Sequence, residues 1–356
     1  MTEPPSTAAI SHEELQLAAR NHAMPLEALR WDVTPIGLHY LLTHYDVPML
    51  DPSAFRLEVD GHVERPLSLG IDDLRMRETV TSTVTMECAG NGRAGLAPRP
   101  VSQPWLLEAV GTGEWTGTPL RGLLADAGIR DGAVEVVFEG ADRGVEGGEA
   151  QAYARSLPLA DALAPEVLLA WGLNGHVLPP QHGFPLRLLV PGWYGMTSVK
   201  WLTRITVTTV PFTGYQNQES YRIRRDEDDP GVPVTRIAPR ALMVPPGVPD
   251  FMTRRRFLPE GRVTVEGRAW SGRAPVVAVE LGVDGEWIPA RLERASGPFA
   301  WRRWTAEWDA AAGEHELSCR CRDEAGGEQP LEASWNVGGY ANNAVQRVAV
   351  TVGGPA

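Results

Sequence analysis

The segment Thr85-Met86-Glu87-Cys88-Ala89-Gly90-Asn91-Gly92-Arg93 decides how this chain is interpreted. It follows residues 80–86, a run typical of a strand, so Cys88 is expected in a turn rich in glycine and asparagine just past a strand end. A soft thiolate there, with Arg93 five positions later, suits a heavy-metal ligand beside a group that binds an anion. A lone cysteine near a strand end can equally be a small buried hydrophobic residue, so this segment alone leaves both interpretations open.

A second segment lies well downstream. It reads His182-Gly183-Phe184-Pro185-Leu186-Arg187 and leads into Pro191-Gly192-Trp193-Tyr194-Gly195-Met196-Thr197-Ser198-Val199-Lys200-Trp201-Leu202. Together the two segments resemble the sulfite oxidase family of molybdopterin enzymes, in its bacterial, haem-free form, where the cysteine of a C-A-G-N-x-R turn binds molybdenum. The resemblance runs from about residue 36 to residue 352 and includes residues 55–61, 153–159, 168–175 and Trp335-Asn336. It implies a molybdenum-molybdopterin cofactor, with Cys88 as the single protein ligand to the metal and no haem in this chain.

The composition is that of an ordinary globular protein. At 356 residues the chain is long enough to form two domains, each with its own hydrophobic core. Charged residues at 22% and hydrophobic residues at 43% argue against a disordered chain. A net charge of -12 without a long track of lysine or arginine argues against nucleic-acid binding. The same charge repels an anionic substrate at long range, so such a substrate needs a local cluster of arginines.

The cysteines and the N-terminal sequence indicate in which cellular compartment the protein is expected. Cys319 and Cys321 would share one face of a strand, which is poor disulfide geometry, so we expect them to be reduced and structural. A Cys-x-Cys metal site stays an alternative, although no further Cys/His cluster accompanies the pair. Residues 1–30 show no apolar core, twin arginine or cleavage site, and no apolar run is long enough to span a bilayer. The expected location is therefore the cytoplasm, without membrane attachment.

The first part of the chain predicts an irregular α+β domain over residues 1–225, with an N-terminal arm at 1–35. Ser11 is a plausible helix N-cap with Glu14 in the capping-box position. We expect strands at 55–59, 134–139, 186–190 and 205–210, and helices at 104–110 and 119–127, the latter ended by Gly128. The Gly-rich residues 111–117 are expected to be a loop, because they miss the dinucleotide-binding spacing. No regular βαβ rhythm indicates a doubly wound sheet.

The remainder of the chain predicts a linker and a second domain. Residues 226–258 begin with an acidic run and are rich in proline, which favours a linker without continuous helix or central strand. In residues 259–356, six runs alternate with the two-residue period of strands, with turn signals such as Asp284-Gly285 between them. These runs, at 263–270, 276–283, 287–292, 301–308, 315–322 and 345–352, indicate a β-sandwich. The resemblance implies the same, an immunoglobulin-like domain that mediates homodimer formation.

The resemblance assigns one group of residues to the cofactor. A strand carrying Arg187 leads into a turn with Gly192 and Gly195, where bare backbone can approach the pterin phosphate while Ser198 and Lys200 add donors. Taken singly, each of these residues is more often a surface residue than a ligand, and it is their order in the chain that favours a site. Asp142 matches an acidic residue that accepts from the pterin amino groups. The full implied set is Tyr40, His44, Cys88, Asp142, His182, Arg187, Ser198, Val199 and Lys200.

The resemblance assigns Arg93, Trp105 and Tyr153, together with Cys88, to the reaction itself. Arg93 offers a planar fork suited to a small oxyanion. Trp105 would form a wall of the pocket, although a tryptophan is more commonly part of a core. Tyr153 could hydrogen-bond the reacting oxygen or relay a proton, and without the motif it is equally a tyrosine at the start of a helix.

Two departures from the family pattern concern the substrate. Leu42 and Thr43 stand where the family carries arginine and asparagine, and Gly338 lies where relatives place an arginine after the Trp-Asn pair. A charge-assisted hydrogen bond contributes about 1.5–3 kcal/mol, so a missing arginine weakens the binding of sulfite without forbidding it. Arg347, or the arginines among residues 222–225, are candidates to replace the missing charge, but the sequence does not place them.

Three functions follow from these residues. The first is oxidation of sulfite to sulfate with electrons passed to an external carrier. The second is reduction of S-oxides or nitrate by the same kind of cofactor, for which a less cationic pocket is acceptable. The third is a non-catalytic binding or scaffold protein whose cofactor site has decayed, against which the retained Cys88, Arg187 and Lys200 speak.

Overall fold

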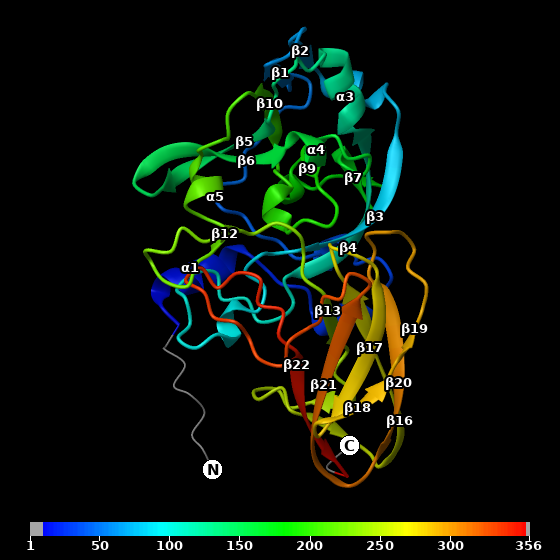
Figure 1. The fold of residues 1–356 in the computed structure, drawn as a ribbon. Coiled ribbons are helices and arrows are strands. Elements are labelled where there is room, and N and C mark those ends of the chain that lie inside the picture. The colour runs from blue at the N-terminus through cyan, green and yellow to red at the C-terminus, as the bar shows by residue number, and fades with distance from the viewer. Residues whose placement is uncertain (1–9, 354–356) are drawn as a thin grey trace.

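The computed structural model describes residues 10–353. Two lobes lie end to end, the first a mixture of sheets and short helices and the second built of strands alone (Figure 1). The predicted fold class, an irregular α+β part followed by an all-β sandwich, is confirmed. No helix among the described residues is both long enough and apolar enough to cross a membrane.

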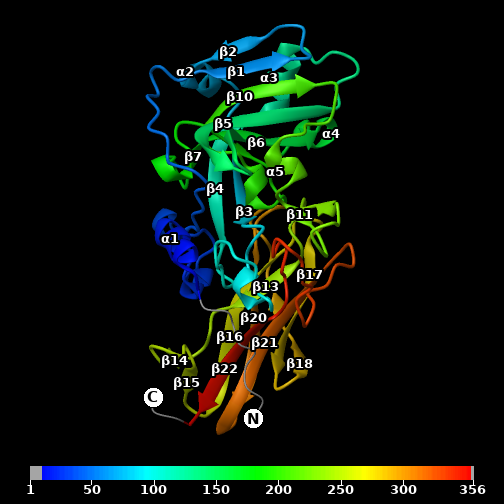
Figure 2. The same cartoon turned by 90° about the vertical axis from the view of Figure 1, so that its left-hand side faces the viewer.

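The first helix of the described residues is α1 (His12–Arg20), which packs beside the junction of the two lobes (Figure 2). The predicted capping box is present, because Ser11 Oγ accepts from the Glu14 amide at 3.2 Å while Glu14 Oε2 accepts from the Ser11 amide at 2.9 Å. The Glu14 carboxylate is buried and pairs with Arg99. Residues 1–9 of the expected arm lie outside the described residues. Two 3₁₀ turns, η1 (Leu26–Arg30) and η2 (Ile36–Leu38), continue the segment.

One sheet of the first lobe forms its outer end. Its order is β2-β1-β10-β5-β6, with β1 and β10 parallel and the other pairs antiparallel. Helix α3 starts after Pro119 and ends at Gly128, whose positive φ gives the predicted C-terminal cap. The elements are β1 (Leu57–Gly61), β2 (Leu67–Leu69), β5 (Glu135–Glu146), β6 (Glu149–Pro158), β10 (Leu202–Thr208), α2 (Ile71–Arg75), α3 (Leu120–Ala127), α4 (Leu159–Ala162) and α5 (Tyr215–Gln218).

The other sheet of the first lobe delivers two of the predicted site residues. Strand β3 (Val80–Glu87) ends directly before Cys88, and β9 (Arg187–Leu189) begins at Arg187. They belong to one sheet with β4 (Val110–Pro119), β7 (Leu168–Leu173) and β8 (His176–Val177), in which β9 pairs with β7. The turns η3 (Arg93–Gly95), η4 (Pro180–His182) and η5 (Gly195–Thr197) carry further residues predicted for the site.

The expectation of a helix at 104–110 followed by a loop at 111–117 is wrong. Residues 104–109 form no helix, and strand β4 runs through the glycine-rich stretch, paired with β3 on one side and β7 on the other. The glycines serve close packing, because a Cβ at Gly117 would lie 2.2 Å from the carbonyl oxygen of Leu169 and one at Gly111 would lie 2.7 Å from the His39 ring. The low strand propensity of glycine concealed the strand, since contacts with neighbouring strands override it.

The second lobe is a sandwich of two sheets, with orders β13-β16-β20-β19 and β14-β15-β22-β21-β17-β18. All six predicted runs are strands, although 287–292 is split in two. Cys319 and Cys321 are free and buried in the core between the sheets. The strands are β13 (Arg240–Met243), β14 (Val248–Pro249), β15 (Arg256–Leu258), β16 (Gly261–Trp270), β17 (Val276–Val283), β18 (Glu286–Pro289), β19 (Arg291–Leu292), β20 (Arg302–Ala310), β21 (Gly313–Asp323) and β22 (Gln346–Val352).

The proline-rich stretch at 226–258 contains a short hairpin strand and three strands of the sandwich. Strand β12 (Val232–Pro233) pairs with β11 (Arg222–Ile223), while β13 and β14 are edge strands, where prolines are tolerated. The division at 225/226 and 258/259 therefore stays a proposal, and the sheets of the second lobe begin at Arg240.

The second lobe holds the turn that carries Cys88. Arg240 of β13 forms a buried ion pair with Glu87 at 2.8 Å, and the Trp270 indole donates to the same carboxylate at 2.8 Å. Further along the turn, the Ala341 amide donates to the Ala89 carbonyl at 2.8 Å, and Asn342 Nδ2 donates to the Gly92 carbonyl at 2.7 Å. The turn is thus fixed by both lobes.

Candidate active site

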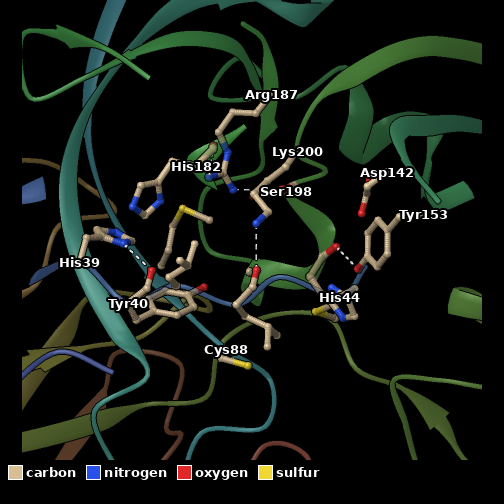
Figure 3. Close-up of a pocket in the computed structure, with 15 residues that line it drawn as sticks. His39, Tyr40, His44, Cys88, Asp142, Tyr153, His182, Arg187, Ser198 and Lys200 are labelled. Carbon is tan, nitrogen blue, oxygen red and sulfur yellow. Dashed lines mark hydrogen bonds between the residues drawn. The ribbon is translucent and has the colours of Figure 1, made fainter. Parts of the chain in front are cut away.

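A cavity in the first lobe gathers most of the residues that the sequence predicts for the cofactor (Figure 3). These residues come from the segment after η2, from the end of β3, from β5 and β6, and from the turns around β9. The predicted residues that line it are Tyr40, His44, Cys88, Asp142, Tyr153, His182, Arg187, Ser198 and Lys200. Residues up to 160 positions apart in the chain, Tyr40 and Lys200, are therefore brought to one site in the predicted combination.

Cys88 lies at the floor of the cavity as a free, buried thiol. Its amide donates to the Ala109 carbonyl at 2.9 Å and its own carbonyl accepts from the Asn91 amide at 3.0 Å, which fixes the tight turn after β3. Burial raises the pKa of the Cys88 thiol, whereas Arg93, the Gly90 amide and the Trp105 indole favour the thiolate. A buried thiol of this kind reaches its charged form when a metal ion binds it.

One end of the cavity is cationic. Arg187 donates to the carbonyls of His182 at 2.9 Å and Ser198 at 3.0 Å, and Lys200 Nζ donates to the carbonyls of Leu42 and Gln181 at 2.9 and 3.0 Å. Burial lowers the pKa of Arg187 to about 10, and burial together with Arg187 lowers the pKa of Lys200 to about 7. Neither side chain forms an ion pair with a carboxylate among the described residues. Arg187, with Lys200 beside it, forms a binding site for an anion such as a phosphate, whose charge would favour the protonated form of Lys200 over the effect of burial.

Two histidines adjoin these cations. His182 and His39 meet edge to face with ring centroids 5.6 Å apart. Burial lowers the pKa of His182 to about 2 and that of His39 to about 4, so both rings are neutral near pH 7. His39 Nε2 is buried without a hydrogen-bond partner. The sequence analysis missed His39, and its position directly before Tyr40 was the signal that could have found it.

The opposite side of the cavity is an aromatic wall. The rings of His44 and Tyr153 lie 4.7 Å apart, and Tyr153 Oη donates to the Met196 carbonyl at 2.8 Å. His44 Nε2 hydrogen-bonds the hydroxyl of Tyr221, a residue that the sequence analysis did not single out. Asp142 lies on the same side in Figure 3, and burial raises the pKa of its carboxyl to about 6 while Lys200 opposes that rise.

Three predicted residues do not line the cavity. Arg93 lies behind the cysteine turn, where Nε donates to the Gly338 carbonyl at 2.9 Å and Nη1 to the Gln103 carbonyl at 3.1 Å. Trp105 is buried in the cluster that contains Cys88. Val199 belongs to the core of the first lobe, where its carbonyl accepts from the Leu188 amide at 2.8 Å.

The arginines considered as replacements for the missing cations are engaged elsewhere. Arg347 pairs with Glu316 and Glu332 at the surface. Arg222 donates to the Pro230 and Gly231 carbonyls, and the side chains of residues 224 and 225 pair with Glu219 and Asp229. Leu42 itself lines the cavity, so its apolar side chain occupies part of the wall. None of these four arginines supplies charge to the pocket.

The chemistry of the donor set fits a molybdopterin cofactor. Among residues 10–353 no three His, Cys, Asp or Glu side chains gather as a metal site, so Cys88 offers one thiolate and further ligands have to come from the cofactor. Arg187 and Lys200 at the other end of the cavity offer hydrogen-bond donors and positive charge that suit a phosphate group. A Cβ at Gly195 would lie 2.2 Å from Tyr40 Oη, so only glycine leaves the space between them open.

Comparisons with known proteins agree with this chemistry. Residues 44–216 match the oxidoreductase molybdopterin binding domain, and residues 242–353 match the Mo-co oxidoreductase dimerisation domain. Sulfite oxidase from Gallus gallus is 36% identical over 88% of this chain and 72% of its own length, and the mitochondrial enzyme from Mus musculus is 35% identical over 90% of this chain. This chain spans 62% of the length of the mouse protein.

Two further proteins widen the range of known activities. An NADH nitrate reductase from Solanum lycopersicum is 31% identical over 90% of this chain and 38% of its own length. The crystal structure of the sulfane dehydrogenase SoxCD from Paracoccus pantotrophus covers 99% of this chain and 92% of its own, with a TM-score of 0.81 and 25% identity. The similarity therefore covers both lobes, while the named substrates differ.

Proposed function

The chain belongs to the sulfite oxidase family of molybdopterin-dependent oxidoreductases, and we propose that it oxidises sulfite to sulfate and passes the electrons to an external acceptor. The observation that carries the proposal is the cavity that places the buried thiol of Cys88 opposite the unpaired cations Arg187 and Lys200. In this reaction sulfite gains one oxygen that derives from water, and two electrons and two protons are released.

In this proposal different residues around the cavity bind different parts of the cofactor. Cys88 binds the metal, while His182, Arg187, Ser198 and Lys200 hold the phosphate. Asp142 accepts from the pterin amino groups, and Tyr40, His44 and the backbone at Val199 complete the pocket. Bound molybdenum supplies the redox change and the transfer of oxygen, which no side chain here supplies alone.

On the substrate side, the chain contributes charge and a protonated phenol. Burial raises the pKa of Tyr153, so its hydroxyl keeps its proton at neutral pH, and it donates this proton to the Met196 carbonyl. His44 stays neutral, since burial lowers its pKa to about 3. Arg93 provides a cation behind the turn of Cys88, and Trp105 excludes water from that turn.

A second candidate function is reduction of an S-oxide or of nitrate. The similarity to a nitrate reductase favours it, as do the apolar Leu42 and the glycine at position 338, which leave the pocket with less positive charge than the family pattern. A decayed, non-catalytic site is the third alternative. It is opposed by the retention of Cys88, Arg187 and Lys200 in one cavity.

The test is one preparation from cells able to assemble the cofactor, analysed for molybdenum and assayed in both directions. We expect about one molybdenum per chain and turnover of sulfite with a ferricyanide acceptor, exceeding turnover of nitrate or dimethyl sulfoxide with a reduced viologen donor. Preferred reduction would establish the second candidate. Absence of molybdenum would favour the scaffold protein.

Two further proposals concern assembly and location. Residues 242–353 match a dimerisation domain, so we propose a homodimer formed through the second lobe, which sedimentation velocity would test. The cytoplasm is the proposed location, consistent with three free cysteines, and cell fractionation would test it.

A further inference from the structure

Asn21, at the C-terminal end of helix α1, is a buried residue whose side-chain amide contacts three parts of the chain. It is 7% exposed. Its Nδ2 donates to the Leu17 carbonyl at 3.0 Å and to Gln103 Oε1 at 2.9 Å, and its Oδ1 accepts from the Thr43 amide at 2.7 Å. One amide group therefore joins helix α1, the loop between η3 and β4, and the segment after η2.

On one side, Asn21 holds the segment that lines the cavity. Thr43 lies between Leu42 and His44, which both line the cavity. The Leu42 carbonyl accepts from Lys200 Nζ at 2.9 Å, and the His44 ring is held by a hydrogen bond with the segment after α5. The contact with Asn21 is therefore the middle one of three on consecutive residues. Because Thr43 is 4% exposed, its amide would be buried without an acceptor if the Asn21 oxygen were removed.

On the other side, Asn21 holds the loop behind the cysteine turn. Gln103 is 5% exposed, and its carbonyl accepts from Arg93 Nη1 at 3.1 Å and from the Trp105 amide at 2.9 Å. Arg93 begins η3, directly after the glycine-rich turn of Cys88. A chain of hydrogen bonds therefore runs from the segment that lines the cavity, through Asn21 and Gln103, to the turn of Cys88.

Helix α1 gives Asn21 a fixed position. Glu14 of the helix is fully buried and forms an ion pair with Arg99 of the loop between η3 and β4. Directly after the helix, His22 and Leu41 pair through two backbone hydrogen bonds, at 3.2 and 2.8 Å. The helix and the residue that follows it are thus attached to both of the segments that Asn21 joins. A side chain on such an anchored element holds its contacts in a defined geometry.

We propose that Asn21 is a positioning residue that fixes residues 42–44 relative to the turn of Cys88 and so keeps the two ends of the cofactor pocket aligned. Asn21 does not line the cavity and acts through Thr43 and Gln103. The inference rests on the proposed function and adds to it a role for helix α1. Alignment matters for the rate, because a displacement of about 1 Å at reacting groups can slow a reaction about 100-fold.

Hydrogen–deuterium exchange of the cofactor-free protein tests the contact itself. In Asn21→Leu we expect the Thr43 amide to exchange about tenfold faster or more than in the unmodified protein, because its acceptor is gone. In Asn21→Asp the carboxylate still accepts from Thr43, and Gln103 can turn its amide group to donate. The exchange rate of Thr43 in this conservative variant should therefore stay within about threefold of the unmodified protein.

The molybdenum-loaded enzyme shows whether the contact serves the reaction. In Asn21→Leu we expect the kcat per bound molybdenum to fall about tenfold or more, while the KM for sulfite stays within about twofold because Asn21 touches no substrate. Asn21→Asp should recover most of the kcat. Asn21→Ala takes the place of Asn21→Leu if the latter yields no folded protein.

Ser11→Ala is the matched control. It removes the N-terminal cap of the same helix, where Ser11 Oγ accepts from the Glu14 amide, and it leaves the contacts of Asn21 in place. We expect this variant to lose stability but to keep the exchange rate of Thr43 and the kcat of the unmodified protein.

A measurement without turnover separates this inference from the proposed function. If the unmodified enzyme does not oxidise sulfite, the proposed function fails. The positioning role is then judged by Thr43 exchange and by the rate of molybdenum loss on dialysis, which should rise about tenfold in Asn21→Leu. Equal exchange of Thr43 in Asn21→Leu and Ser11→Ala would overturn the inference, and so would an equal kcat per molybdenum in an active enzyme.

Discussion

At the scale of single residues, the chemistry of the pocket depends on which buried groups carry charge. Arg187 is a cation that forms no ion pair with a carboxylate, and Lys200, whose pKa burial lowers to about 7 while Asp142 opposes that change, can gain or lose its proton near neutral pH. His39, His44 and His182 are held neutral by burial. A neutral imidazole can accept a hydrogen bond at one nitrogen and donate at the other, which suits the edge of a polar cofactor. The pocket therefore presents positive charge at defined points and neutral hydrogen-bonding groups between them.

His39 makes the protein sensitive to acid. Its pKa is about 4 in the folded protein against an ordinary value of 6.5, so between these pH values the unfolded chain binds more protons and stability falls as the pH falls. From pH 7 to pH 5 this group alone removes about 2 kcal/mol, at about 1.36 kcal/mol per pKa unit. We expect cofactor-free His39→Gln to lose about 2 kcal/mol less than the unmodified protein over that range.

Urea unfolding of the cofactor-free protein at pH 7 and pH 5 checks this expectation. His176→Gln is the control, because His176 is exposed on the short strand β8 and does not line the cavity. An equal loss of stability in His39→Gln and in the unmodified protein would show that His39 is protonated in the folded state.

The order of motifs in the sequence was sufficient to predict nine lining residues of the cavity, because the family pattern ties each to a position in the chain. It did not find His39 or Tyr221. Tyr221 reaches the site through a hydrogen bond with His44, which joins the segment after α5 to the segment after η2, and these segments are far apart in sequence. Periodicity reports one element at a time and carries no information on such contacts.

At the scale of elements, the end of β3 is the point where the two lobes meet. Glu87 precedes Cys88 and forms with Arg240 of β13 an ion pair in which both side chains are 1% exposed. The Trp270 indole and the side-chain Nδ2 of Asn91 also donate to this carboxylate, at 2.8 and 3.0 Å. Strand β13 of the second lobe therefore helps to hold the turn of Cys88 in place.

Breaking this pair should be costly. Arg240→Met leaves Glu87 as a buried charge without its cation, which destabilises a protein by about 3–5 kcal/mol. The double variant Glu87→Gln with Arg240→Met removes both charges and should recover most of that loss. Arg262→Met, which breaks an exposed pair with Glu307, should cost about 1 kcal/mol or less.

Free energies of unfolding for the four proteins form the measurement. If Arg240→Met proves no more destabilising than Arg262→Met, the junction does not depend on the buried pair.

The sequence predicted some strands correctly and missed others. The sandwich could be predicted from the alternation of apolar and polar residues. One face of each strand meets the core and the other meets solvent, in β16, β17, β20, β21 and β22. Strand β4 was missed because its glycines, selected for close contact with β7 and His39, have low strand propensity. Strand β13 was missed because prolines surround it, as they can at a sheet edge.

At the scale of the whole molecule, the two lobes act on one site. The first lobe supplies the cavity, and the second supplies the partners of Glu87, Ala89 and Gly92 on the cysteine turn. The match of the two lobes to a molybdopterin-binding and a dimerisation domain agrees with this arrangement. The sequence predicted the two-part architecture from composition and periodicity, but not that the second lobe would reach the cysteine turn.

The bond between Cys88 and the metal is the central claim, and molybdenum K-edge X-ray absorption tests it directly. The loaded enzyme is compared with Cys88→Ser and with Cys321→Ser, whose thiol is equally buried but lies in the sandwich core. Cys88→Ser should keep its fold, lose turnover and show one sulfur ligand fewer, while Cys321→Ser matches the unmodified enzyme. An unchanged sulfur count in loaded Cys88→Ser would contradict the assignment of Cys88 as the metal ligand.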